Sequence, residues 1–159
     1  MAAGKYDKQF VTDLKADIPA TKWHPKVQPV QKGKNGRILY MDSDLVPGAF
    51  YNECVWIYNA SGDVQKQGGI QAHSHDHDEV LGFFGTNLED PYDLGAEIEF
   101  WLGDEKNILT RTCLIFIPKG LKHCPLRVLK VKTPVFHFSA HAGKEYTHRN
   151  NIIAEPAKS

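Results

Sequence analysis

The strongest constraint on the fold is a series of short β-type runs, separated by turn residues, that extends from Arg37 to Ala140. The runs are rich in aromatic and β-branched side chains, and turn-forming residues recur between them at intervals of roughly 8–12 residues. This spacing is typical of all-β sandwiches and barrels, and no convincing central helix interrupts it. We expect about nine strands, among them residues 37–41, 49–59, 70–75, 80–84, 96–102, 108–117, 123–131 and 135–140.

The segments on either side of this region are more polar. Residues 6–15 have the spacing of a short helix, and the proline-punctuated stretch that follows carries the apolar residues Ile18, Trp23, Val27 and Val30. We interpret residues 1–34 as an arm, residues 35–141 as a barrel and residues 142–159 as a tail. The arm would cover either its own barrel or that of a partner, so a homodimer is one expectation.

Composition excludes several classes of function. The chain of 159 residues has 19 basic and 19 acidic residues, a balance that argues against a nucleic-acid partner. No apolar run approaches the length of a membrane span, and the N-terminus has no secretory signal. The cysteines Cys54, Cys113 and Cys124 lack CxxC spacing, which favours a reducing, cytoplasmic setting. We therefore expect one domain in the cytoplasm, with no membrane and no nucleic acid among its partners.

Possible metal ligands are concentrated in residues 68–85. His73, His75, His77 and Glu79 fall within seven residues, and imidazole and carboxylate groups are the usual ligands of zinc, iron, manganese and nickel. His73 and His75 are two apart, so on a strand both side chains point to the same face. The spacing predicts that these two imidazoles can reach one metal ion.

Glu79 can join the same ion only if the chain reverses direction after His75. Six residues of straight strand span roughly 20 Å, which is too far for a shared ligand. Residues 76–78, Asp-His-Asp, are of the types that form turns. This places His77 at the tip of the turn and outside the metal ligands, in solvent or near a substrate.

A fourth ligand should come from another part of the chain. His123 is the best candidate, because it follows a tight turn at residues 118–120 that opens a strand. His137 is the alternative, and it could also line the cavity without binding metal, or simply be a hydrogen-bonded core residue.

These residues resemble the two signature motifs of the cupin superfamily. The first motif, with HxH and a following glutamate between glycines, is carried by Gly68, His73, His75, Glu79 and Gly85. The second, PxGxxH, is carried by Pro118, Gly120 and His123. Thr112 stands where the second motif usually has glycine, and Arg127 stands where it usually has asparagine.

The resemblance covers roughly residues 37–140 and implies a double-stranded β-helix, the jelly-roll barrel of cupins. It also implies that His73, His75, Glu79 and His123 bind one divalent transition metal inside the barrel. Iron, zinc, manganese and nickel are the candidates. The departures at Thr112 and Arg127 leave these four residues intact.

Other polar residues have open interpretations. Arg127 is an even number of residues from His123, so on a regular strand both side chains point to the same face. Arg127 then lines the cavity and holds an anionic substrate, or it forms a surface ion pair. Cys124 has the opposite parity and should face away from the metal. Glu97 and Glu99 are interpreted as a solvated sheet face, and His141 and His148 as surface residues. An apolar wall would come from inward-facing members of the set Phe83, Phe84, Phe100, Phe116 and Phe138.

The function expected from these residues is that of a metalloenzyme acting on a small organic substrate. A redox metal would serve a dioxygenase, whereas zinc would act as a Lewis acid in an isomerase or lyase. Glu79, His137 and Arg127 are the candidates for catalytic roles. The alternative is a protein that binds or senses a metal and a small ligand without turnover.

Overall fold

The computed structural model describes residues 5, 7–14, 31–61 and 71–142, and these residues are almost entirely β-structure. The strands are β1 (Gly36–Met41), β2 (Tyr51–Ile57), β3 (Glu79–Gly85), β4 (Asp93–Leu102), β5 (Glu105–Arg111), β6 (Cys113–Ile117), β7 (His123–Val131) and β8 (Val135–His141). A 3-10 helix, η1, covers only Asp7–Gln9. The longer helix expected at residues 6–15 is therefore wrong in the part described. None of the η1 residues is buried, so no packing stabilises a longer helix.

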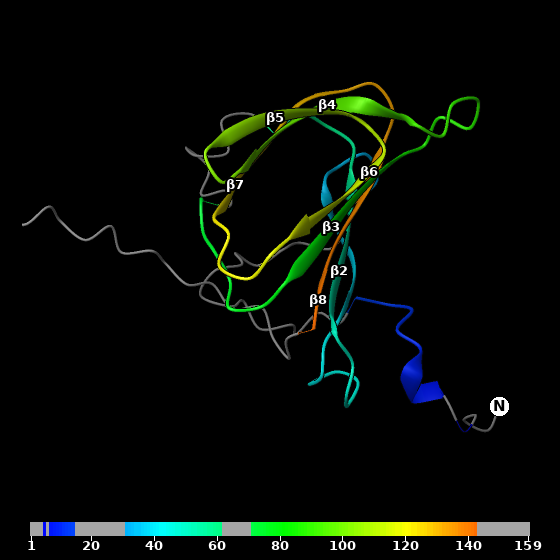
Figure 1. The fold of residues 1–159 in the computed structure, drawn as a ribbon. Coiled ribbons are helices and arrows are strands. Elements are labelled where there is room, and N and C mark those ends of the chain that lie inside the picture. Colours follow the sequence, from blue (N-terminus) through cyan, green and yellow to red (C-terminus); the bar gives the residue numbers. More distant parts are fainter. Residues whose placement is uncertain (1–4, 6, 15–30, 62–70, 143–159) are drawn as a thin grey trace, which may run out of the picture.

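The strands form two antiparallel sheets that curve around a common interior (Figure 1). One sheet has the order β1-β2-β8-β3-β6, and the other has the order β5-β4-β7. After β3 the chain crosses to β4 and β5, returns to β6, crosses again to β7 and returns to β8. This alternation is the jelly-roll topology of a double-stranded β-helix, which confirms the predicted fold class.

The hydrophobic core lies between the inner faces of the two sheets. Its fully buried side chains include Phe83 from β3, Leu94, Ile98 and Phe100 from β4, and Val135 from β8. Inward-facing positions alternate along the strands, as the period of two requires. Each large side chain buried in this way contributes about 1.5–3 kcal/mol to the stability of the fold.

Two of the predicted strands differ from the observed ones. The range 108–117 is divided between β5 and β6, and the chain leaves one sheet for the other at Thr112. The Thr112 N–H donates to the Tyr92 carbonyl oxygen (2.9 Å), and its Oγ1 accepts a hydrogen bond from the Gly85 N–H (3.1 Å). The range 70–75 has no regular strand in its described part, where only an isolated bridge joins His73 to His123.

Gly85, the last glycine of the first motif, sits where the chain leaves β3. A Cβ atom at this position would lie 2.0 Å from the Asp93 carbonyl oxygen, so the close approach of the two backbones requires glycine.

Most of the predicted arm and tail lies outside the described residues. None of the helices described in the structure is long and apolar enough to span a membrane.

Candidate metal centre

The two motifs meet at one end of the barrel, where residues 71–78 run beside the β6–β7 connection (Figure 1). The backbones of His73 and His123 exchange hydrogen bonds of 3.0 and 2.9 Å. Further along, the Gly120 N–H donates to the His75 carbonyl oxygen at 2.8 Å, and the Lys119 N–H donates to Asp78 Oδ1 at 2.8 Å. The tight turn of the second motif is thus held directly against the first motif.

Three imidazoles converge at this junction. One ring nitrogen from each of His73, His75 and His123 lies within 4.8 Å of the others, so this group could hold a metal ion. The three residues are 4%, 3% and 1% exposed, respectively. Buried histidines without a shared ligand would be costly, because each ring carries a polar nitrogen that needs a partner.

Hydrogen bonds to backbone carbonyls determine which nitrogen of His73 and of His123 faces the centre. The Nδ1–H of His73 donates to the Gln71 carbonyl oxygen (2.6 Å), and the Nδ1–H of His123 donates to the Leu121 carbonyl oxygen (3.0 Å). A carbonyl oxygen only accepts, so Nδ1 carries the proton and Nε2 presents its lone pair. This is how the imidazoles of metal-binding histidines are usually oriented.

Glu79 joins the three histidines at the first residue of β3. Its Oε2 lies 3.2 Å from His75 Nε2 and 3.3 Å from His123 Nε2. The Ser139 hydroxyl donates to the other oxygen, Oε1, at 2.6 Å and so orients the carboxylate. The bend at residues 76–77 provides the reversal that brings Glu79 back toward His75.

The donor set fits a divalent cation. Glu79 Oε2 is buried and accepts no hydrogen bond from the described residues, although two imidazole nitrogens are close. The proton of His123 is on Nδ1, so its Nε2 carries a lone pair. This lone pair faces Glu79 Oε2, which also has only lone pairs, so the two atoms cannot hydrogen-bond to each other. Metal bonds of about 2.0–2.2 Å would place neighbouring ligand atoms about 3.0–3.5 Å apart, which matches these separations.

Burial sets the protonation states that metal binding needs. Desolvation, with smaller repulsion from His123 and His75, lowers the pKa of His73 to about 4. Burial alone would raise the pKa of Glu79, but its contacts with His123, His75 and Ser139 hold it below the usual range. At neutral pH His73 is therefore a neutral imidazole and Glu79 is an ionised carboxylate.

His77 and His141 both lie beside the candidate metal centre. This contradicts the surface position expected for His141, and for His77 it favours the place near the site over the place in solvent. The side chain of His77 is only 14% exposed, and its ring stacks on His141 with centroids 3.9 Å apart. His141 is buried, and its ring also stacks on Tyr51 at 4.4 Å. The sequence favours a surface position for His141 because it does not show that β8 ends beside the turn at residues 76–78.

A polar network continues from this stack along the inner face of β2. The Tyr51 hydroxyl donates to Glu53 Oε2 (2.6 Å), and the Arg37 Nη2–H donates to the same oxygen (2.9 Å). Arg37 and Glu53 are both buried, so the ion pair is screened little by solvent. The wall of the barrel beside the centre is thus polar and positioned by hydrogen bonds.

His137 lies on the inner face of β8 but away from the ligand cluster. Its Nδ1–H donates to the Gly82 carbonyl oxygen (2.9 Å), and its ring stacks on Phe83 at 4.3 Å. Burial lowers the pKa of His137 and keeps it neutral. Among the interpretations offered by the sequence, the structure favours a hydrogen-bonded core histidine.

Arg127 faces outward and does not line the barrel. Its Nη1 lies 3.3 Å from Glu99 Oε1, which also accepts a hydrogen bond from Trp101 Nε1 at 3.1 Å. Glu99 is buried at 8% exposure, so the expectation of a solvated face is wrong for Glu99; the side chain of Glu97 is 46% exposed.

A β-bulge in β7 explains the position of Arg127. Between the pairs Phe100–Leu126 and Leu102–His123, β7 contains one more residue than β4. The extra residue reverses the alternation of side chains along β7, so His123 and Arg127, which are four residues apart, point to opposite faces of the sheet. Cys124 lies at this bulge and is 6% exposed, and its pKa is raised by burial and by the charge of Glu79.

The aromatic wall is smaller than the sequence suggests. Phe83 and Phe100 point into the barrel, whereas Phe116 is 58% exposed on the outer face of the five-stranded sheet. Phe84 and Phe138 also lie on that outer face, because they pair in register with the outward-facing Phe136 and Gly82.

Sequence reasoning missed His141 and the Arg37–Glu53–Tyr51 network. A signal for His141 was present, because His137, Ser139 and His141 alternate along one strand and must share a face. In β1, a bulge lies between Arg37 and Leu39. Because of this bulge, the alternation of residues along the strand does not predict which face of the sheet the Arg37 side chain is on.

A scan against models of protein families found no match, and a search of curated proteins found none either. Among solved structures, the chain is similar to an RmlC-like cupin from Shewanella frigidimarina NCIMB 400, with 14% identity and a TM-score of 0.40 over 75% of this chain and 85% of that chain. It is similar to an oxalate oxidase in complex with the substrate analogue glycolate, with 14% identity and a TM-score of 0.49, covering 91% of this chain but only 64% of that chain. A protein with a double-stranded β-helix domain from Klebsiella pneumoniae has 14% identity and a TM-score of 0.47, with 77% and 88% covered.

The strand order and the placement of the two motifs carry the assignment of the fold. The chain alternates between two antiparallel sheets in jelly-roll order, and both histidine motifs meet at one end of the barrel. With these features, the chain has the double-stranded β-helix fold, and its two histidine motifs resemble those of cupins.

Proposed function

We propose that His73, His75, His123 and Glu79 bind one divalent transition metal and that the chain is a metalloenzyme acting on a small organic substrate. One observation carries this proposal. Glu79 Oε2 lies 3.2 and 3.3 Å from two imidazole nitrogens in a buried site, and it accepts no hydrogen bond from the described residues. A cation between these atoms would satisfy all of them at once.

The protein's own residues would position the reactants. Iron, manganese or nickel would supply oxygen or redox chemistry in such a site, and zinc would supply Lewis acidity. Ser139 orients the Glu79 carboxylate through its hydrogen bond to Oε1. The His77 ring stacks on His75 with centroids 4.9 Å apart, so His77 would lie beside a substrate that enters next to His75.

The metal proposal is tested by elemental analysis of protein purified without added metal and then reconstituted with iron, zinc, manganese or nickel. We expect close to one metal ion per chain. Glu79→Gln, which preserves shape but removes the charge, should weaken metal affinity at least about tenfold, as should His123→Ala.

His77→Phe is the matched control, because it preserves the ring stack on His141 and removes the ring nitrogens. This variant should retain the metal. Absence of any stoichiometric transition metal, both before and after reconstitution, would refute the proposed site. Loss of metal in His77→Phe but not in Glu79→Gln would show that the ligands are assigned wrongly.

The reaction class is tested separately on the metal-loaded protein. Oxygen consumption across a panel of enols, catechols and keto acids would identify an oxygenase, whereas conversion of a substrate without oxygen uptake would identify Lewis-acid chemistry. Stable metal retention without turnover of any compound would favour a binding or sensing protein.

A further inference from the structure

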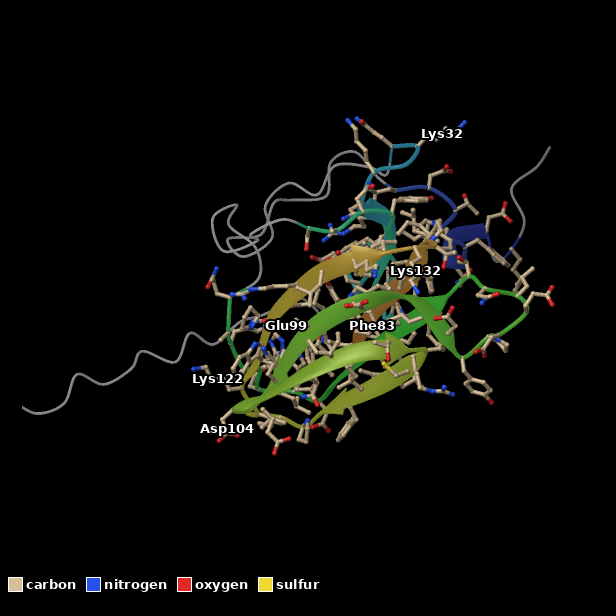
Figure 2. The ribbon with its side chains drawn as sticks, turned by 90° about the horizontal axis from the view of Figure 1, so that it is seen from above. Lys32, Phe83, Glu99, Asp104, Lys122 and Lys132 are labelled. Atoms are coloured by element: carbon tan, nitrogen blue, oxygen red, sulfur yellow. The ribbon has the colours of Figure 1, made fainter. Side chains whose placement is uncertain are left out.

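A groove of about 510 Å³ lies beside the chain segments that carry His73 and His123. Ala72, Lys122 and Cys124 line it, and these are the chain neighbours of His73 and His123. The remaining lining residues come from β4, the β4–β5 turn and β7: Trp101, Gly103, Asp104, Pro125 and Arg127. Figure 2 shows Glu99, Asp104 and Lys122 toward the same end of the molecule.

Two cationic side chains reach the groove with unused hydrogen-bonding capacity. Lys122 forms no ion pair with any of the described residues. Within the described part of the chain, Arg127 contacts Glu99 only through Nη1, and its side chain is 32% exposed, so the guanidinium group keeps donors for a ligand. A guanidinium group and an ammonium group with free donors favour an anion bound between them.

The wall of the groove is apolar and fixed in orientation. Trp101 donates its Nε1–H to Glu99 Oε1 (3.1 Å), and the same oxygen lies 3.3 Å from Arg127 Nη1. Glu99 therefore holds the indole ring and the guanidinium group in one arrangement. Rigid aromatic side chains of this kind lose little entropy when a planar ligand stacks on them.

We propose that this groove binds a small planar organic anion, namely an aromatic carboxylate. The carboxylate would accept hydrogen bonds from the Arg127 guanidinium group and from Lys122, while the ring would lie against Trp101 and Pro125. A purely apolar ligand would leave Lys122 without an acceptor and Arg127 with Glu99 alone, and inorganic phosphate alone would leave the apolar wall uncovered. Asp104 at the rim disfavours ligands with a larger negative charge. No side chain of the four candidate metal ligands lines the groove, so this site is independent of the proposed function.

Isothermal titration calorimetry with 2-naphthoate tests the site on the full chain, both metal-free and metal-loaded. We expect a dissociation constant of about 1 mM. This is the affinity expected when a ligand with about 13 non-hydrogen atoms, such as 2-naphthoate, binds with ordinary ligand efficiency. The neutral isostere 2-naphthamide should bind at least about tenfold more weakly, because it carries no charge to pair with Arg127 and Lys122. Glu79→Gln should leave naphthoate binding unchanged.

Arg127→Gln and Trp101→Leu should each weaken naphthoate binding about tenfold. Lys122→Gln changes an exposed side chain and provides a variant with little risk to folding. Lys130→Gln is the matched control, since Lys130 is also on β7 but pairs with Glu97 outside the groove (3.5 Å).

Three results would overturn the proposal. The first is no detectable heat at 10-fold the expected dissociation constant. The second is equal affinity for the acid and the amide. The third is binding that is abolished by Glu79→Gln but unaffected by Arg127→Gln and Lys122→Gln, which would place the anion in the barrel.

Discussion

His141 shows how burial sets the chemistry of the residues around the candidate metal centre. Desolvation, with added repulsion from a charged His77, lowers the pKa of His141 to about 4. His73 has the same value for the same main reason. Both rings are therefore neutral at pH 7, which permits the stack of His77 on His141 at 3.9 Å.

The metal-free protein should lose stability as the pH falls from about 6.5 to about 4. In this window the unfolded histidines bind protons, because their pKa is about 6.5, whereas folded His73 and His141 do not. Each lowered pKa therefore leaves the free energy of unfolding unchanged above pH 6.5 and decreases it below that pH. By pH 4 the decrease is about 3 kcal/mol per residue. Urea unfolding at intervals between pH 7.5 and 4.5 measures the slope.

His141→Phe is the control for this prediction, because it keeps an aromatic ring against Tyr51 and removes the titrating group. Its free energy of unfolding should depend less steeply on pH. Equal slopes for the variant and the natural chain would contradict the role assigned to His141.

The β4–β5 hairpin illustrates control at the level of the element. Leu102 pairs with Glu105, so Gly103 and Asp104 form a two-residue turn. Gly103 has a φ of 64°, and Asp104 is not among the residues with positive φ. A positive φ at the first position alone is the pattern of a type II′ turn, which matches the twist of the paired strands.

Gly103→Ala should destabilise the fold by about 1–2 kcal/mol through backbone strain alone. The nearest heavy atom to an added Cβ is 3.9 Å away, so no steric clash contributes. Chemical denaturation measures the change, and Asp104→Ala is the matched control in the same turn. A similar loss in both variants would mean that the conformation of Gly103 is not the cause.

The outer face of the five-stranded sheet is the most unusual feature of the whole molecule. Its outward positions carry the apolar residues Cys54, Trp56, Val80, Phe84, Leu114, Phe116, Phe136 and Phe138. Trp56 contacts Phe136 at 5.5 Å, and Phe138 covers the surface of Gly82. Leu114 and Phe116 are nevertheless 63% and 58% exposed. An apolar face of this kind usually marks a protein interface.

We propose that a second copy of the chain covers this face. These outward positions carry no charged side chain, so two identical faces can meet without burying an unpaired charge. Five strands spaced about 4.8 Å apart give a width of about 24 Å. That width is close to the side of a standard interface of about 800 Å² per partner.

Sedimentation equilibrium should show a dimer of the natural chain and a monomer of the double variant Leu114→Lys/Phe116→Lys. Both positions are exposed, so the substitutions should leave the monomer folded. Arg111→Lys, on the neighbouring sheet, is the control and should remain dimeric. A monomeric natural chain at micromolar concentration would refute the interface.

The sequence by itself determined the all-β class, the order of the two motifs and the reversal between His75 and Glu79. These features depend on local chemistry. Alternating apolar runs favour strands, and residues such as Asp76 and Asp78 favour a bend wherever they occur. His123 could be named as the partner of the first motif through a resemblance, and the tertiary structure brings its Nε2 within 3.3 Å of Glu79.

Only the tertiary structure decided which way several side chains face. One extra residue in β7 turns Arg127 away from the barrel, and the crossing at Thr112 assigns β5 and β6 to different sheets. The packing of β8 against β2 and β3 carries His141 to the side of His77. The physical reason is common to all three cases. The facing of a residue depends on its register with a partner strand that is distant in sequence, and a single bulge reverses it.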